Sequence, residues 1–194
     1  MAYQHTSRRG DVYWIQARER GGKTVYSAAR KPTGNPVDRL PEGYEIYERP
    51  ENAQVFVRKI QLTRILPIEK QLVEESICRL AQLEHFIVEV ETNSLVVYLP
   101  DADPDASLSL MRTTVPMTAE RARSMKAVML SRARYEKMMR FTLVEEPSRR
   151  FNAERWCFLG GIDDWYFLAR DKPLVKLVET YTPHLGRESF FELM

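Results

Sequence analysis

The chain has 194 residues, of which 44% are apolar and 29% are charged, so it is long enough and apolar enough to bury a hydrophobic core. This composition excludes a disordered chain, and the net charge of +2 is too small to indicate a nucleic-acid partner by itself. No stretch approaches the roughly 18 apolar residues of a membrane span, and residues 1–20 lack the apolar run of a signal peptide. The sequence therefore predicts a cytoplasmic protein with no membrane partner.

The first predicted element is a β-hairpin, although its turn also matches a nucleotide-binding pattern. Residues 17–24 end in Gly-Lys-Thr, as a permissive phosphate loop does, but such a loop needs a helix after it. Residues 25–31 begin with Val and Tyr and run into Pro32, which is typical of a strand. We therefore interpret Gly21 and Gly22 as the positive-φ residues of a tight turn and predict no nucleotide site.

Two more hairpins are predicted in the first half of the chain. Residues 44–48 alternate aromatic or aliphatic side chains with acidic ones, and residues 54–60 return after a turn at Pro50. Residues 85–90 and 95–99 form the third hairpin. Successive hairpins indicate an antiparallel sheet.

An amphipathic helix is predicted between the second and third hairpins, at about residues 66–83. Apolar residues recur there at intervals of three and four, and Glu69 is assigned to the polar outer face. Cys78 borders the apolar stripe of this helix, and Cys157 also lies among apolar residues. Because the two cysteines are far apart in the sequence, we expect two buried thiols rather than a disulfide.

Residues 100–105, Pro-Asp-Ala-Asp-Pro-Asp, cannot continue a strand and predict a loop or a boundary. Alternate aspartates begin a calcium loop, but Pro104 intrudes and neither the Gly nor the final Glu of such a loop follows. We therefore interpret this segment as a solvated acidic loop. After it we expect a helix, three strands, a helix and a docked apolar tail, at about residues 118–135, 138–145, 155–159, 165–169, 173–181 and 188–193.

These elements predict an α+β fold, with a predominantly antiparallel sheet built from successive hairpins and two or three packed helices. Residues 1–100 are expected to form a hairpin-rich N-terminal half with one amphipathic helix, and residues 101–194 an α+β C-terminal half. The two halves are expected to pack together as one compact unit. The three histidines have no Cys or His close by in the sequence, so no metal site is predicted, and no motif indicates a cofactor.

Four basic residues fall within one arc of about 80° on the wheel of the helix that begins at Thr118. They are Arg123, Lys126, Arg134 and Lys137. Such a face suits phosphate groups, a nucleic-acid backbone or an acidic protein partner. The alternative interpretation is a solvated helix face without a ligand.

A second set of residues would suit catalysis. Asp163 and Asp164 follow a Gly-Gly turn, and paired carboxylates can divide acid and base roles, although a turn between two strands explains them as well. His184 is a candidate general base, with Ser189 or Cys157 as the nucleophile. A histidine at a helix end also has a structural interpretation, as a cation near the C-terminal dipole.

The leading hypothesis is therefore a non-catalytic binding or assembly module with a phosphate- or nucleic-acid-binding basic face. The alternative is a small hydrolase-like enzyme that uses the acidic residues and the histidine in a cleft. Self-association is also expected, because residues 61–116 carry 4 Lys/Arg against 9 Asp/Glu, a net charge of −5, whereas both flanking segments are net positive. The sequence does not identify a substrate or a biological partner.

Overall fold

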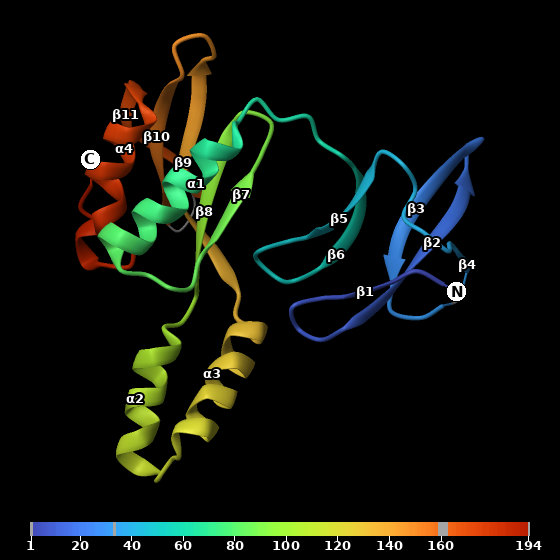
Figure 1. The fold of residues 1–194 in the computed structure, drawn as a ribbon, viewed down its shortest axis with the longest axis horizontal. Helices are drawn as coiled ribbons and strands as arrows, with labels where there is room; N and C mark the ends of the chain where they lie inside the picture. The colour runs from blue at the N-terminus through green and yellow to red at the C-terminus, as the bar shows by residue number, and fades with distance from the viewer. Residues whose placement is uncertain (1, 33, 159–162, 194) are drawn as a thin grey trace. The chain divides into compact units, whose positions relative to one another are not determined.

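The computed structural model describes residues 2–32, 34–158 and 163–193, and it divides into two compact units (Figure 1). Unit 1 comprises Met1–Ile60 and Asp101–Arg134, and unit 2 comprises Gln61–Pro100 and Tyr135–Met194. Each unit is therefore built from two separate segments of the chain. The predicted division into halves at residue 100 stays a prediction about domains.

Unit 1 begins with a small antiparallel sheet in which β2 pairs with three other strands. The strands are β1 (Gln4–Thr6), β2 (Val12–Arg20), β3 (Lys23–Ala29) and β4 (Asn35–Pro36). Arg20 pairs with Lys23 across the β2–β3 turn, where Gly21 has a φ of 59° and Gly22 a φ of 71°. The predicted hairpin is confirmed, because both turn residues occupy the left-handed region that glycine adopts without a Cβ penalty. No helix follows the Gly-Lys-Thr pattern, and the absence of nucleotide binding stays a prediction.

The second predicted hairpin is also present in unit 1. It consists of β5 (Tyr44–Glu48) and β6 (Val55–Lys59), which pair from Tyr44↔Lys59 to Glu48↔Val55. Arg58 lies over the ring of Tyr47, 3.7 Å from its centroid, and bonds to Glu45. These contacts across the pair stabilise a two-stranded sheet that is marginal without such support.

Two antiparallel helices complete unit 1: α2 (Pro104–Thr114) and α3 (Ala119–Arg132). The interpretation of residues 100–105 as an acidic loop is wrong from residue 104 on. Asp103 caps α2, because its carboxylate accepts hydrogen bonds from the backbone N–H groups of Asp105 and Ala106, and Pro104 takes the first helical position. The same Asp-Pro pattern that ends a strand therefore starts a helix. The predicted cap of α3 is confirmed, since Thr118 accepts from the Arg121 N–H.

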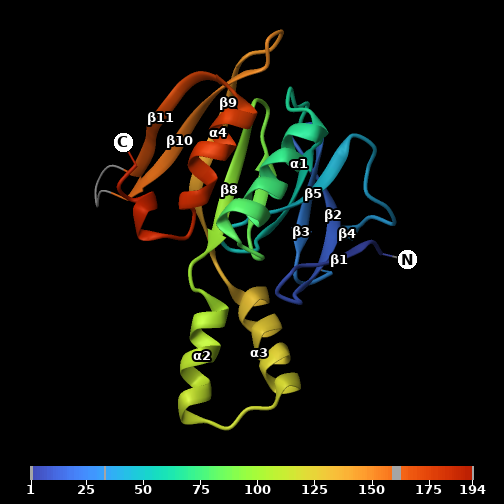
Figure 2. The same ribbon diagram turned by 60° about the vertical axis from the view of Figure 1, so that its left-hand side comes forward.

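Unit 2 is built on a five-stranded antiparallel sheet in the order β11-β10-β9-β8-β7; Figure 1 labels all five strands, and Figure 2 shows β8 to β11 from another side. Its strands are β7 (Ile87–Val90), β8 (Ser94–Pro100), β9 (Tyr135–Glu145), β10 (Arg150–Phe158) and β11 (Asp163–Pro173). The helical pair α2–α3 lies in the sequence between β8 and β9, which are neighbours in the sheet. The pair is therefore an insertion between two adjacent strands.

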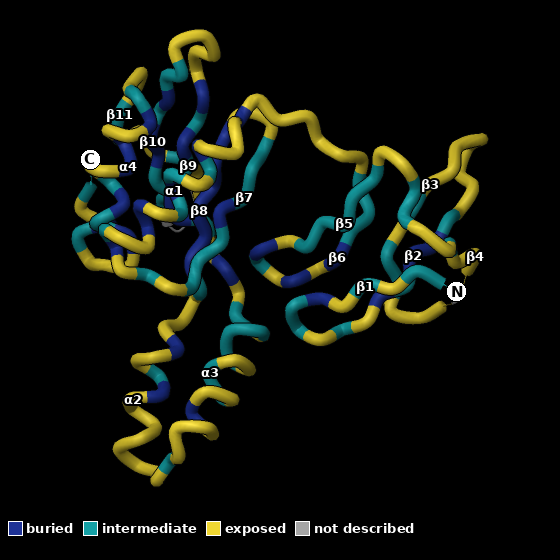
Figure 3. The backbone as a smooth tube through the Cα atoms, viewed as in Figure 1, coloured by how far each residue is buried: buried dark blue, intermediate teal, exposed yellow. Residues whose placement is uncertain are grey.

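Helices cover one face of this sheet and enclose the hydrophobic core. They are α1 (Pro67–Ser76), which continues as a π-helical turn at Ile77–Ala81, and α4 (Leu174–Tyr181). The core includes Val73 and Ile77 from the first helix, Leu177 from α4, and Phe141 and Phe151 from the sheet. Figure 3 shows β8 and β9 largely in the colour of buried residues. The predicted α+β fold with antiparallel sheets built largely from hairpins is confirmed.

Three details of unit 2 differ from the sequence analysis or refine it. Glu69 is buried rather than on the outer face, because it bonds to Arg149. The two thiols are free, but Cys78 is exposed and Cys157 only half-buried, so the expected burial is wrong. The π turn directs Ile77 into the core and leaves its neighbour Cys78 outside. In the tail, Phe190 is buried in the core.

Candidate functional site

The four predicted basic residues do not share one helix. Arg123 is exposed on α3, and Lys126 donates a hydrogen bond to Asp105 at 2.8 Å. Arg134 follows the end of α3 at Arg132, and Lys137 lies on β9 in unit 2. Helical periodicity therefore does not apply to the last two, and the premise of a single helix face is wrong. Whether any of these residues contacts a ligand stays a prediction.

The predicted catalytic residues are only partly brought together. Asp163 and Asp164 are exposed at the start of β11, and the carboxylate of Asp164 accepts from the Trp165 N–H at 2.7 Å. Most of the predicted turn that precedes them lies outside the described residues. His184 Nδ1 lies 2.9 Å from Ser189 Oγ. Within the described ranges, neither aspartate bonds to the histidine, and no cluster of three or more His, Cys, Asp or Glu residues could hold a metal ion.

A different surface brings aromatic and basic side chains together in unit 2, on the sheet face opposite α1 and α4. Cross-strand register creates it: Arg140 pairs with Glu154, Glu154 with Phe167, and Trp156 with Trp165. Alternation places Phe151 and Ala153 of β10 in the core, so Glu154 and Trp156 must point to the other face. We call this surface the aromatic–cationic face and define it as Lys137, Arg140, Trp156, Trp165, Phe167 and Arg170.

The centre of the aromatic–cationic face is a fixed arginine. The carboxylate of Glu154, only 3% exposed, accepts hydrogen bonds from Arg140 Nε at 2.7 Å and Nη2 at 2.8 Å, and a third from Thr142 Oγ1 at 2.8 Å. A bidentate pair of this kind holds the guanidinium plane in one orientation. Arg140 consequently lies 4.4 Å from the ring centroid of Trp165, within cation–π range.

Aromatic rings lie on both sides of Arg140: the tryptophan pair towards the start of β11, and Phe167 towards its end. The Trp156 and Trp165 rings meet edge to face, with centroids 5.1 Å apart, and Lys137 Nζ lies 5.5 Å from the Trp156 centroid. Towards the other end of β11, Phe167 is 40% exposed, and the guanidinium of Arg170 lies 4.0 Å from its ring. Apolar rings and cations therefore alternate over three adjacent strands.

Sequence reasoning missed this face, although one signal for it was present. Trp156 and Trp165 are equally distant from the Gly160-Gly161 pair, so a hairpin centred on these glycines places the two rings opposite each other. The hairpin itself was predicted. The partners from β9 had no such signal, because the pairing of β9 with β10 shifts by one residue between Arg150 and Phe151, and this bulge decides which residue of β9 lies opposite Glu154.

A groove of about 380 Å³ is the second candidate site, and it also lies within unit 2. Apolar residues from α1, β10 and α4 dominate its walls, among them Leu72, Phe151 and Leu174. Its polar lining includes the pair of Arg149 and Glu69, in which Arg149 Nε donates to the carboxylate at 2.8 Å and the pKa of Arg149 is raised by this bond. These two charges neutralise each other, but Glu75 also lines the groove, so its charge is net negative and does not suit a phosphate.

Comparison with family models, with curated proteins and with solved structures finds no match for this chain. Within the described residues, no helix is long and apolar enough to span a membrane.

Proposed function

We propose that this protein is a non-catalytic binding module whose aromatic–cationic face takes single-stranded nucleic acid. The observation that carries the proposal is the juxtaposition of Trp156, Trp165 and Phe167 with Lys137, Arg140 and Arg170 on one sheet face. Bases stack on aromatic rings with a gain of about 1–3 kcal/mol each, while nearby cations neutralise the phosphates. Unpaired bases are needed, because the flat faces of paired bases are covered in a duplex.

The arrangement also supports a particular division of roles. Phe167 and the two tryptophans offer ring surface for stacking, and Arg170 is exposed at the end of the row. Arg140 is neutralised by Glu154, so it contributes a rigid planar surface more than net charge. Binding of this kind tolerates many sequences, since every base has a flat face.

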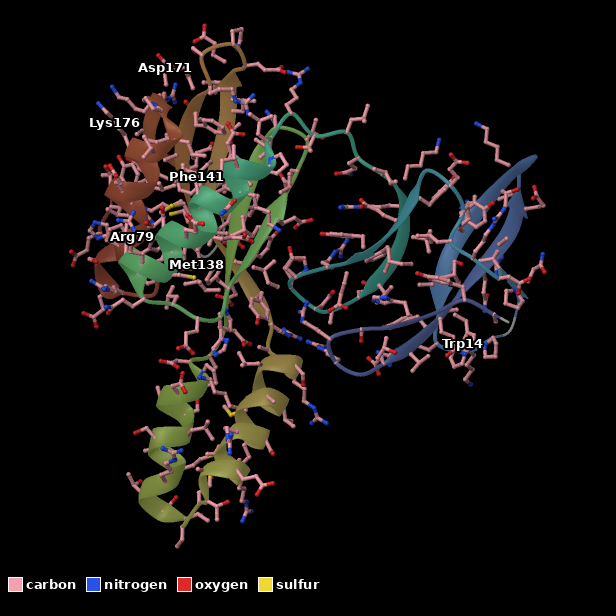
Figure 4. The ribbon with its side chains drawn as sticks, viewed as in Figure 1. Trp14, Arg79, Met138, Phe141, Asp171 and Lys176 are labelled. Atoms are coloured by element: carbon pink, nitrogen blue, oxygen red, sulfur yellow. The ribbon has the colours of Figure 1, made fainter. Side chains whose placement is uncertain are left out.

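Fluorescence anisotropy with labelled single-stranded DNA and RNA of about 12 nucleotides tests the proposal. Trp156→Ala and Phe167→Ala should each weaken binding by about tenfold, which corresponds to the loss of one stacked base. Arg170→Gln should make the salt dependence shallower by about 0.7 on a log–log plot. Trp14→Ala on β2 of unit 1 is the matched control, because it removes a half-buried tryptophan from a different sheet (Figure 4).

Two results would contradict the proposal. One is the absence of binding to either strand type at about 50 mM salt, where phosphate contacts are strong. The other is an equal loss of affinity from Trp14→Ala and Trp156→Ala. If binding occurs but depends instead on Arg123 and Arg134, which are two of the four residues of the predicted basic face, the ligand surface lies on unit 1.

A hydrolase is the second candidate function, and one observation favours it. His184 Nδ1 and Ser189 Oγ are 2.9 Å apart, which is the reach required of a base and its nucleophile. Both side chains are half-buried, and neither lines the groove between α1 and α4. An enzyme would be supported if the chain hydrolyses an ester and if both Ser189→Ala and His184→Gln lose this activity while they keep the fold. If the original chain shows no hydrolysis above background, this use of the pair is excluded for the ester tested.

A further inference from the structure

The outermost strand of the unit 2 sheet, β11, has one edge without a partner strand. It is 11 residues long and pairs only with β10 in the described part of the chain. An edge strand presents a row of backbone N–H and C=O groups that can pair with another chain, and proteins usually keep such strands short or place charges in them. β11 is about twice the usual strand length, so this edge is an unusually large pairing surface.

The middle of β11 lacks the charges that would prevent pairing. Five consecutive apolar residues occupy Trp165–Ala169, and Tyr166 is 45% exposed and Phe167 40% exposed. Adjacent side chains point to opposite faces of a sheet, so both faces of the strand present an aromatic ring beside the open edge. The register with β10 shifts on both sides of Ala169, Asp171 has a φ of 53°, and the Leu168 carbonyl accepts a hydrogen bond from Tyr181 Oη at 3.2 Å. These irregularities lie between Phe167 and Lys172, whereas the segment from Asp163 to Phe167 is regularly paired with β10.

Charge is distributed along β11 so that the strand complements itself. Asp163 and Asp164 begin the strand, and Arg170 and Lys172 lie near its end. The intervening Asp171 accepts a hydrogen bond from Arg150 Nε at 3.0 Å, so its charge is compensated within the chain (Figure 4). An antiparallel pair of identical strands places each acidic start opposite the basic end of its partner, whereas a parallel pair aligns like charges.

We propose that β11 pairs antiparallel with β11 of a second copy of this chain, about a two-fold axis perpendicular to the sheet. The two five-stranded sheets then form one continuous sheet, and the same patch of each copy contacts its equivalent, as in a closed dimer. This inference does not rest on nucleic-acid binding. If that binding also occurs, the dimer places two aromatic–cationic faces on the same side of the joined sheet.

Reversal of the charges at each end of β11 gives a direct test by sedimentation velocity without nucleic acid. One variant carries Asp163→Lys and Asp164→Lys, and the other carries Arg170→Glu and Lys172→Glu; all four positions are exposed, so the fold should be retained. Each variant alone faces like charges across the edge and should dimerise at least about tenfold more weakly than the original chain. An equimolar mixture of the two should form a heterodimer, because each end then faces an opposite charge.

The control variant carries Glu120→Lys and Arg123→Glu, two exposed reversals on α3 of unit 1, and it should dimerise like the original chain. Circular dichroism checks that all variants fold. Even weak specific dimers form at a concentration of about 100 µM. If the original chain is purely monomeric at this concentration, the proposal is overturned. A dimer that neither end-reversed variant weakens, or a mixture that forms no heterodimer, also overturns it.

Discussion

The two compact units bury apolar side chains to different extents. In unit 2 a contiguous cluster joins α1, α4 and the sheet, with fully buried side chains such as Phe141, Phe151 and Met139. In unit 1 the buried hydrophobic residues among those described are few: Tyr13, Ile15, Ala53, Val55, Leu108 and Ala122. The helical pair α2–α3 contains only the last two of these. Most of the stability of unit 2 therefore comes from burial, whereas α2 and α3 depend on caps and local bonds.

This difference teaches which surfaces are suited to a precise site. The aromatic–cationic face belongs to the unit with the larger core, where packed strands on the other side hold each backbone position. Arg123 and Lys126, in contrast, lie on α3, of which only Ala122 is buried. A site on rigid strands keeps its geometry better than one on helices with little burial.

Removal of a ring from the larger core should have the greatest effect on stability. Phe141 is fully buried in β9 (Figure 4), and Phe141→Ala should lower the free energy of unfolding of unit 2 by about 3–5 kcal/mol, because it leaves a cavity. Urea denaturation followed by fluorescence measures the change. Val144→Ala on the same strand is the control, since Val144 is 50% exposed. A loss below about 1 kcal/mol for Phe141→Ala would contradict the comparison of the two units.

The helical pair should respond locally to the loss of one buried side chain. Leu108→Ala should lower the stability of α2–α3 by about 2 kcal/mol, at the low end for a buried leucine because Leu108 lies outside the main hydrophobic cluster. Hydrogen exchange should then accelerate at the amides of 104–132 and stay unchanged in β8–β10. The exposed Leu110 provides a control through Leu110→Ala. Equal acceleration in both units would show that they unfold together.

The β2–β3 turn should be sensitive to a side chain at one glycine. Gly22 has a φ of 71°, which costs a β-branched residue about 1–2 kcal/mol. Gly22→Val should therefore destabilise this hairpin. Hydrogen exchange should accelerate at the amides of β2 and β3 and stay unchanged at the amides of unit 2. Gly22→Asn is the control, because Asn tolerates the left-handed region better than valine. If Gly22→Val and Gly22→Asn accelerate exchange in β2 and β3 equally, the left-handed conformation of Gly22 in this turn is contradicted.

The smallest predicted effect concerns a surface carboxylate of unit 2. The hydrogen bond from Arg150 lowers the pKa of Asp171 below its ordinary value of 3.8. A lowered pKa in the folded state stabilises the fold above the unfolded value, and this contribution is lost as the pH falls through the folded pKa. Arg150→Met should raise the pKa of Asp171, as measured by NMR titration. The stability that is lost as the pH falls through this pKa should then be smaller. Lys172→Met should change the pKa of Asp171 less than Arg150→Met does. A larger change from Lys172→Met would contradict Arg150 as the main cause of the lowered pKa.

Local chemistry explains why the hairpins were predictable. Gly21 and Gly22 between strand-forming residues specify a turn wherever the strands pack, and the phosphate-loop pattern fails for lack of a helix. The cap at Thr118 was also readable from neighbouring residues. In contrast, α2 was missed because Asp103 and Pro104 signal a strand end and a helix start equally well.

The sequence by itself therefore determined the antiparallel hairpins, most helices and the fold class, because turns, caps and periodicity act over a few residues. Only the tertiary structure decided that Glu69 is buried, since its partner Arg149 is 80 residues away. It also decided the register of β9 against β10, which shifts between Arg150 and Phe151, and with that the contact of Arg140 with Trp165. The strands of the candidate site follow one another in the sequence, but the bulge between β9 and β10 offsets every later pair by one residue, and the turn residues alone do not indicate that bulge.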